Sequence, residues 1–285
     1  VDVLIGLWDS WDADAFVRDR ETSTFFEWDK MHVLNHKGKH FQVEGPLNVA
    51  RSPQGRPVIV QAGASEEGRE LAAKSADVIF GASQSIEMAQ EFYSDVKGRL
   101  ARYGREQNDL KVLPGLSVTV AQSEREAQAK YDELQDLIHP DHGLAFLSRR
   151  IGHDLTSLDP DILMPDLPPI DDVGTRSGQM LELAKKENWT LRQLYQHFAA
   201  ARGHMVLIGT PSMVADTMEE WVNKRACDGF NIIPSIFPDE FESFVDLVVP
   251  ELQRRGLYRK TYDGNTLREL LGLRIPESQY NTPAI

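Results

Sequence analysis

The chain has 285 residues, of which 41% are hydrophobic, so it is long enough to bury a substantial core in one or two domains. Its 31 basic and 44 acidic residues give a formal net charge of −13, which argues against a nucleic-acid or anionic-membrane surface but not against a local phosphate site. The single cysteine, Cys227, excludes an internal disulfide framework and a cysteine-rich zinc site. No apolar run reaches the roughly 20 residues of a membrane span, so we expect a soluble cytoplasmic protein.

The first 56 residues predict a helix followed by a largely irregular segment. Apolar residues in VDVLIGLWDSW recur at helical spacing, so the chain starts within or just before a helix, and we expect a fragment of a longer protein. Two short runs on either side of residues 36–39 predict a β-hairpin.

The segment PVIVQAGASEEG, residues 57–68, predicts a strand, a tight turn and the start of a helix. Three β-branched residues favour a strand over 57–61 that is buried on both faces of a parallel sheet, including Val60. Small residues then allow close approach of a ligand to the backbone, and Ser65 is a predicted N-cap for a helix over 66–75. Free N–H groups and the positive helix end make such a turn suitable for the phosphate of a nucleotide or flavin. An ordinary βα turn fits the same residues equally well.

Strands and amphipathic helices then alternate along most of the chain, which predicts a parallel α/β sheet. Further strands are expected over 77–81, 111–120, 205–208 and 230–234, and helices over 85–103, 124–138, 211–225 and 239–254. Periodicity does not distinguish a doubly wound sheet from a (β/α)8 barrel. In both, the functional face lies beyond the carboxyl ends of the strands, where Gln61 to Ser65 would sit.

Residues 139–200 interrupt this rhythm. The stretch 159–178 is rich in Pro, Asp and Gly and predicts a long loop or lid, which is followed by helices over 178–187 and 190–200. After the last predicted helix, residues 256–285 are expected to form an extended arm. We therefore divide the chain into a barrel portion over 1–255, with its insertion, and this arm.

Familiar catalytic motifs are not found in the sequence. GxGxxG, GxxxxGK[ST], HExxH and GxSxG do not occur. His139 and His142 have metal-like spacing but no third ligand nearby, so we predict no metal site. His153, at the entrance to the insertion, is a candidate pocket residue, although a structural role is favoured for it.

Five segments together resemble the flavin-dependent monooxygenases of the bacterial luciferase-like superfamily, in the branch with nitrilotriacetate, EDTA, dibenzothiophene-sulfone and long-chain alkane monooxygenases. The segments are HKGKHFQVEGPLN, RPVIVQAGASEEGRELAAKSADVIF, ARGHMVLIGTPSMVADTMEEWV, DGFNIIP and FVDLVVPELQRRGLYR. The resemblance runs from about residue 1 to residue 275. It implies a luciferase-like (β/α)8 TIM barrel with an insertion.

The resemblance also implies a function and a cofactor site. The enzyme would oxygenate a small organic substrate with O2 and with reduced FMN that a separate flavin reductase supplies. The family's QAG[AS]S turn corresponds to Gln61, Ala62, Gly63, Ala64 and Ser65, which would bind FMN, with Ala64 and Ser65 at its phosphate. The insertion would cover the flavin ring and shape the substrate pocket, and we expect a homodimer or homotetramer.

The resemblance also has a gap, because family members carry N-terminal strands and further flavin contacts before the segment VDVLIGLWDSW. If this chain stands alone, we expect weak FMN binding and no turnover. Two other functions remain open: a deazaflavin-dependent oxidoreductase on the same barrel, and a non-catalytic flavin-binding fragment.

Overall fold

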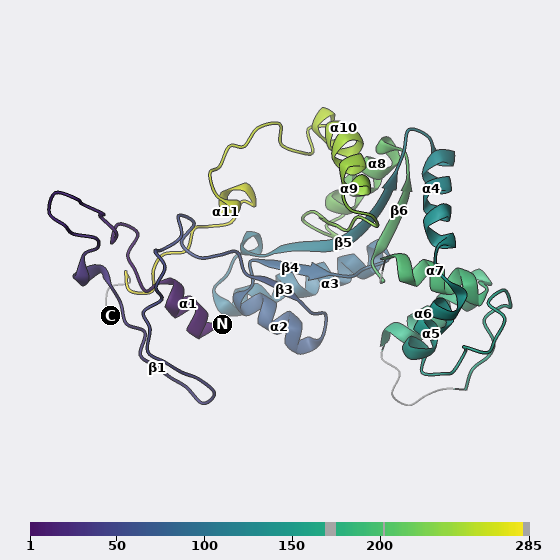
Figure 1. Ribbon diagram of the computed structural model, residues 1–285, viewed down its shortest axis with the longest axis horizontal. Coiled ribbons are helices and arrows are strands. Elements are labelled where there is room, and N and C mark those ends of the chain that lie inside the picture. Colours follow the sequence, from purple (N-terminus) through teal and green to yellow (C-terminus); the bar gives the residue numbers. More distant parts are fainter. Residues whose placement is uncertain (169–174, 202, 282–285) are drawn as a thin grey trace. The chain divides into compact units, whose positions relative to one another are not determined.

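The computed structural model describes residues 1–168, 175–201 and 203–281 (Figure 1). The chain forms two compact units. Unit 1 contains Val1–Phe80, Tyr93–Val112 and Lys260–Ile285, and unit 2 contains Gly81–Phe92 and Leu113–Arg259. Among the described residues, no helix combines the length and the apolar content that crossing a membrane requires.

Unit 1 is built from short strands and helices drawn from three parts of the chain. Its elements are α1 (Asp2–Trp8), β1 (His36–Lys37), β2 (Gln42–Val43), β3 (Val60–Ala62), α2 (Glu66–Ser75), β4 (Val78–Gly81) except its last residue, the second half of α3 (Ile86–Arg99) and α11 (Leu267–Leu270). β1 and β2 form the predicted antiparallel hairpin, and β3 lies parallel to β4 with Gln61 opposite Ile79. Helix α2 has the predicted bounds, and α3 continues through a 3-10 turn to Gly104, whose φ of 65° ends it.

The prediction for the strand before this helix is wrong in part. β3 begins at Val60 rather than at residue 57, and Val60 is 60% exposed instead of buried on both faces. The physical reason is that β3 is an edge strand among the described residues, paired with β4 alone. Just before it, the backbone N–H of Ile59 bonds to a carboxylate oxygen of Asp77 at 2.8 Å instead of to a neighbouring strand. β-Branched residues indicate a pleated surface, not burial of both its faces.

Unit 2 contains the longest strand and two separate cores. β5 (Lys111–Val120), whose first two residues belong to unit 1, lies parallel to β6 (Met205–Gly209) and to β7 (Asn231–Ile232). The predicted strand over 230–234 is therefore only two residues long. Helices α4 (Glu124–Asp136), α8 (Pro211–Asn223), α9 (Asp239–Ser243) and α10 (Val249–Arg254) follow the strands, and a π-helical turn joins the last two. One core packs strand residues such as Leu116 and Val118 against Trp221 of α8 and Phe244.

The insertion in unit 2 is more helical than predicted. It contains α5 (Pro140–Ile151), α6 (Thr175–Glu187) and α7 (Leu191–Ala201), which Figure 1 shows gathered together. Helix α5 was not predicted, and α6 begins three residues earlier than expected. The three helices share a second core that includes Leu147, Ile151, Leu194 and Tyr195. Of the predicted lid over 159–178, residues 159–168 are irregular and residues 169–174 lie outside the described chain.

Candidate functional site

The turn between β3 and α2 brings the five predicted site residues together. β3 ends at Ala62, α2 begins at Glu66, and three residues connect them. Ser65 has extended backbone angles, and its hydroxyl accepts the N–H of Gly68 at 3.2 Å, which makes it the predicted N-cap. The other N–H groups of this first helical turn have no acceptor within the helix, and α2 has ten residues to contribute its dipole. The turn therefore offers hydrogen-bond donors and positive potential to an anion.

Glycine at two positions lets the turn fold tightly against the first turn of α2. A Cβ atom on Gly63 would lie 2.7 Å from Nε2 of Gln61, and one on Gly68 would lie 3.0 Å from the carbonyl oxygen of Gly63. The Gln61 amide thus covers the turn from the strand side. Its Oε1 is buried and has no hydrogen-bond partner among the residues that the structure describes. A buried amide oxygen of this kind is suited to accept a hydrogen bond from a ligand.

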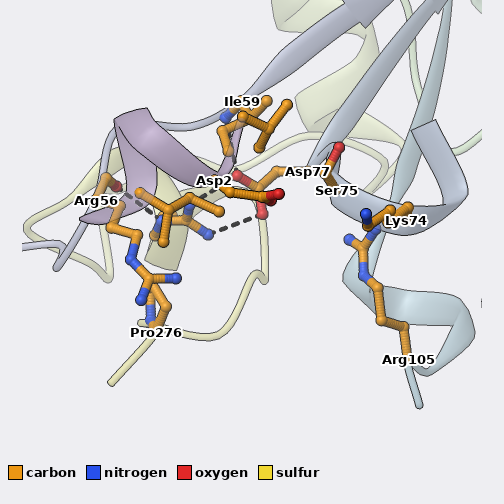
Figure 2. A pocket seen from close by; sticks show the side chains of 11 residues that line it. Asp2, Arg56, Ile59, Lys74, Ser75, Asp77, Arg105 and Pro276 are labelled. Carbon is orange, nitrogen blue, oxygen red and sulfur yellow. Dashed lines mark hydrogen bonds and ion pairs between the residues drawn. The ribbon is translucent and has the colours of Figure 1, made fainter. Parts of the chain in front are cut away.

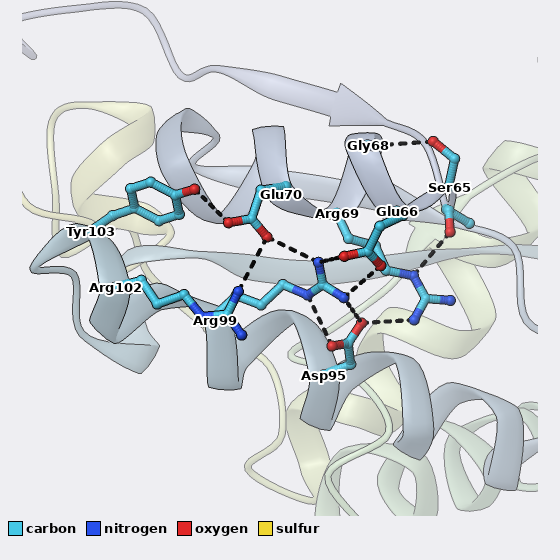
Figure 3. Close-up of polar contacts among 10 residues, drawn as sticks. Ser65, Glu66, Gly68, Arg69, Glu70, Asp95, Arg99, Arg102 and Tyr103 are labelled. Atoms are coloured by element: carbon cyan, nitrogen blue, oxygen red, sulfur yellow. Dashed lines mark hydrogen bonds and ion pairs between the residues drawn. The ribbon is translucent and has the colours of Figure 1, made fainter.

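Arg69 holds the turn from the helix side. Its Nε donates to the carbonyl oxygen of Ala64 at 2.9 Å, and its Nη1 donates to Oδ2 of Asp95 in α3 at 2.7 Å (Figure 3). Burial raises the pKa of the Asp95 carboxyl, but the hydrogen bonds from Arg99 and Arg69 together lower it by a larger amount, so the net shift of the pKa is downward. Asp95 is therefore a carboxylate at neutral pH and a firm anchor for Arg69.

Arg99 neutralises the acidic residues beside the turn. Its guanidinium donates to both carboxylate oxygens of Glu66 at 2.6 and 2.8 Å, to Asp95 at 2.9 Å and to Glu70 at 3.0 Å (Figure 3). These contacts lower the pKa of Glu66, chiefly through the hydrogen bond from Arg99. An unpaired Glu66 carboxylate in the first turn of α2 would repel a bound anion. Its pairing with the buried Arg99 guanidinium removes much of that repulsion.

Sequence reasoning identified the turn but missed the residues that support it. Asp95 and Arg99 are one helical turn apart, and opposite charges at that spacing predict an ion pair on α3. The contacts of this pair with Arg69 and Glu66 join two helices. That step needed the packing of α2 against α3, which no local pattern supplies.

A cavity at the other end of the strands is not the candidate site. It has a volume of about 230 Å³ and is lined by Ile59 and Asp77, which precede β3 and β4, and by Arg105 and Arg268 (Figure 2). Both of these arginines are engaged: Arg268 contacts Asp77 at 2.6 Å, and Arg105 donates to carbonyl oxygens at the end of α2, including that of Ala73 at 2.8 Å. Residues at this end of a parallel sheet serve stability rather than chemistry.

The remaining sequence candidates occupy other places. Nε2 of His153 lies 2.8 Å from the carbonyl oxygen of Pro168, which ties its ring to the loop after α5, and its role in a pocket stays a prediction. The rings of His139 and His142 meet edge to face, and the described part of the chain holds no cluster of three or more potential metal ligands. Cys227 is buried, and desolvation raises its pKa to about 12, so it is not a ready nucleophile.

Comparison with known proteins identifies the family. The family described as luciferase-like monooxygenase matches residues 22–226. The chain belongs to the luciferase-like monooxygenase family. The strands and helices described above are accordingly those of the luciferase-like TIM-barrel type, which confirms the predicted fold class.

Individual members of the luciferase-like family are similar over nearly all of this chain. N-acetyl-S-(2-succino)cysteine monooxygenase of Bacillus subtilis (strain 168) is 50% identical over 283 residues, which are 98% of this chain and 64% of that protein. Nitrilotriacetate monooxygenase component A of Aminobacter aminovorans is 48% identical over 286 residues, 100% of this chain and 63% of that protein. Among solved structures, riboflavin lyase (RcaE) with modified FMN and riboflavin is 30% identical with a TM-score of 0.77, covering 96% of this chain and 60% of that one. The chain thus spans less than two thirds of the length of these relatives.

Proposed function

We propose that this chain provides the FMN phosphate site of a two-component monooxygenase, which oxygenates a small organic substrate with O2 and with reduced FMN from a separate reductase. The observation that carries the proposal is the β3–α2 turn, where Gln61, Ala62, Gly63, Ala64 and Ser65 lead into a capped helix end that offers N–H donors to an anion. Membership of the luciferase-like monooxygenase family supports the same assignment.

The chemistry of the turn suits FMN in two respects. Backbone N–H groups at the start of α2 would bind the phosphate, with Ser65 closing the helix end and Gly63 allowing close approach. The buried Oε1 of Gln61 needs a donor, which phosphate oxygens do not offer but the ribityl hydroxyls of FMN do. When bound, the flavin supplies the redox and oxygen chemistry, while the protein binds and orients it.

The proposed partners follow from the relatives. One relative is named component A of nitrilotriacetate monooxygenase, and a component A implies at least one further component, for which we propose a flavin reductase. The names of these two relatives include small organic substrates, and we propose a small organic substrate for this chain as well. We also propose a homodimer or homotetramer as the assembled form.

The test compares FMN with riboflavin, which lacks only the phosphate. Titration of each flavin against the protein, followed by flavin fluorescence, is expected to show FMN binding about tenfold more tightly, equivalent to about 1.4 kcal/mol. Ser65→Ala is expected to reduce this preference because it removes the cap at the anion site. Thr266→Ala is the matched control, since it removes the N-cap of α11, away from the turn. Equal affinities for FMN and riboflavin in the wild type would contradict the proposal.

A further inference from the structure

The direction of the N–H groups in the β3–α2 turn depends on a contact behind the turn. The carbonyl oxygen of Ala64 accepts a hydrogen bond from Nε of Arg69 at 2.9 Å. That carbonyl and the N–H of Ser65 belong to one peptide group, which is planar and trans, so the two point in opposite directions. A side chain that fixes the Ala64 carbonyl therefore also fixes the N–H of Ser65, one of the donors at the anion site.

The guanidinium of Arg69 is itself held in place by α3. Its Nη1 donates to Oδ2 of Asp95 at 2.7 Å, and Asp95 in turn accepts from Nε and Nη2 of Arg99 at 2.9 and 3.0 Å (Figure 3). Arg99 is 8% exposed, so this support is anchored within the unit rather than at its surface. The planar fork of Arg69 thus spans two fixed acceptors, one on the turn and one on the neighbouring helix.

We propose that Arg69 is a positioning residue for the anion site: it orients the Ser65 N–H toward phosphate through the Ala64 carbonyl, and Asp95 orients Arg69. The inference rests on the proposed function, because it assigns a role within the same phosphate site. Arg69 acts through geometry and not through its charge. A lysine keeps the charge but lacks the planar fork that reaches both Ala64 and Asp95.

Substitution of Arg69 by lysine therefore distinguishes a role that depends on geometry from one that depends on charge alone. In Arg69→Lys and Arg69→Ala, FMN affinity is expected to fall about tenfold, the loss typical of one charge-assisted hydrogen bond, while riboflavin affinity stays unchanged. The ratio of the two affinities then approaches one. Asp95→Asn is expected to lower the ratio to a smaller extent, because the amide keeps one acceptor for Arg69.

Arg102 offers a matched control in the same group of residues. Its side chain is 67% exposed, and its Nη1 lies 3.7 Å from Oε2 of Glu70, which is in α2 and not in the turn. Arg102→Lys and Arg102→Ala make the same chemical changes and are expected to keep the wild-type ratio. Urea unfolding of each variant shows whether a change in binding reflects a loss of folded protein.

The outcomes distinguish the inference from the function on which it rests. A wild-type ratio near one would overturn the phosphate site, and the role of Arg69 with it. A wild-type preference for FMN that survives in Arg69→Lys would overturn only the positioning role, since charge would then suffice. An equal loss of FMN and riboflavin affinity in Arg69→Lys would also overturn it, because that result indicates general damage to the fold.

Discussion

At the scale of single residues, Asp9 of unit 1 is a buried carboxylate that depends on two arginine partners. Its side chain is fully buried, lies 2.6 Å from Nη1 of Arg51 and 3.0 Å from Nε of Arg56, and accepts the N–H of Gln279 at 3.0 Å. We expect Asp9→Ala to lower the free energy of unfolding by about 3–5 kcal/mol, because two largely buried guanidinium groups lose their partner. Urea unfolding measures the change.

The control for Asp9 is another aspartate with a close basic partner. Asp14 lies 2.6 Å from Nζ of Lys30, but its side chain is 74% exposed. Asp14→Ala is expected to change the free energy of unfolding little, since solvent already screens this pair. Comparable losses for Asp9→Ala and Asp14→Ala would mean that burial does not decide the strength of the Asp9 contacts.

The same carboxylate predicts an acid-dependent stability. Burial raises the pKa of Asp9, but the hydrogen bonds from Arg56 and Gln279 and the charges of both arginines outweigh burial and hold it below 3.8. A lowered pKa in the folded state gives stability that is present above the unfolded pKa and lost as the pH falls through the folded value. The stability difference between wild type and Asp9→Ala should therefore be constant near neutral pH and shrink below pH 3.8. A difference independent of pH would contradict this.

Residues were predictable where their role is local. Ser65 was identified as an N-cap because its hydroxyl accepts an N–H only three residues later. Arg69 was not connected with Asp95, because the two are 26 residues apart and meet only when α2 packs against α3. The anion site could thus be located from its turn, but its supporting residues could not.

At the scale of elements, helix bounds were predicted best where capping signals are plain. The N-cap of the missed helix α5 is His139, whose ring Nδ1 accepts the N–H of Asp141 at 3.3 Å, and histidine is not among the usual capping residues. The sequence Pro-Asp-His-Gly at its start also resembles a loop. The glycine in that run has a packing role, which only the structure shows.

Gly143 of α5 is expected to tolerate no side chain. A Cβ atom there would lie 2.6 Å from the ring of Tyr195, which is fully buried in α7. Gly143→Ala should destabilise the protein by about 1–3 kcal/mol through overpacking, despite the better helix propensity of alanine. Gly98→Ala is the matched control, because a Cβ atom on Gly98 in α3 meets nothing within 4 Å. It should stabilise by up to about 1 kcal/mol. Urea unfolding of both variants checks the prediction, and a gain of stability in Gly143→Ala would contradict it.

At the scale of the whole molecule, alternating strands and helices predicted the α/β class, since that signal repeats along the chain. Which segments of the chain make up each unit was not predictable. Unit 1 contains segments from the first, middle and last parts of the chain. The predicted C-terminal arm contributes Arg268, which links the segments before β3 and β4. Arg268, only 4% exposed, lies 2.6 Å from Asp77 before β4 and donates to the carbonyl oxygens of Arg56 and Pro57 before β3 at 3.0 and 3.1 Å. The division at residue 255 stays a prediction.

Removing this contact should loosen unit 1 selectively. In Arg268→Gln the shorter amide cannot span Asp77 and the carbonyl oxygens before β3, so we expect faster amide hydrogen exchange over 57–62 and 77–81. Exchange in β6 and α8 should change little, because these elements share a separate core within unit 2. Arg274→Gln is the control: its side chain is 69% exposed and pairs with Asp109, so its loss should leave both regions near wild type. Hydrogen exchange followed by mass spectrometry measures all four segments. An equal rise in all of them would show that the two units open as a single cooperative structure, and that the last segment of the chain supports the whole fold rather than unit 1.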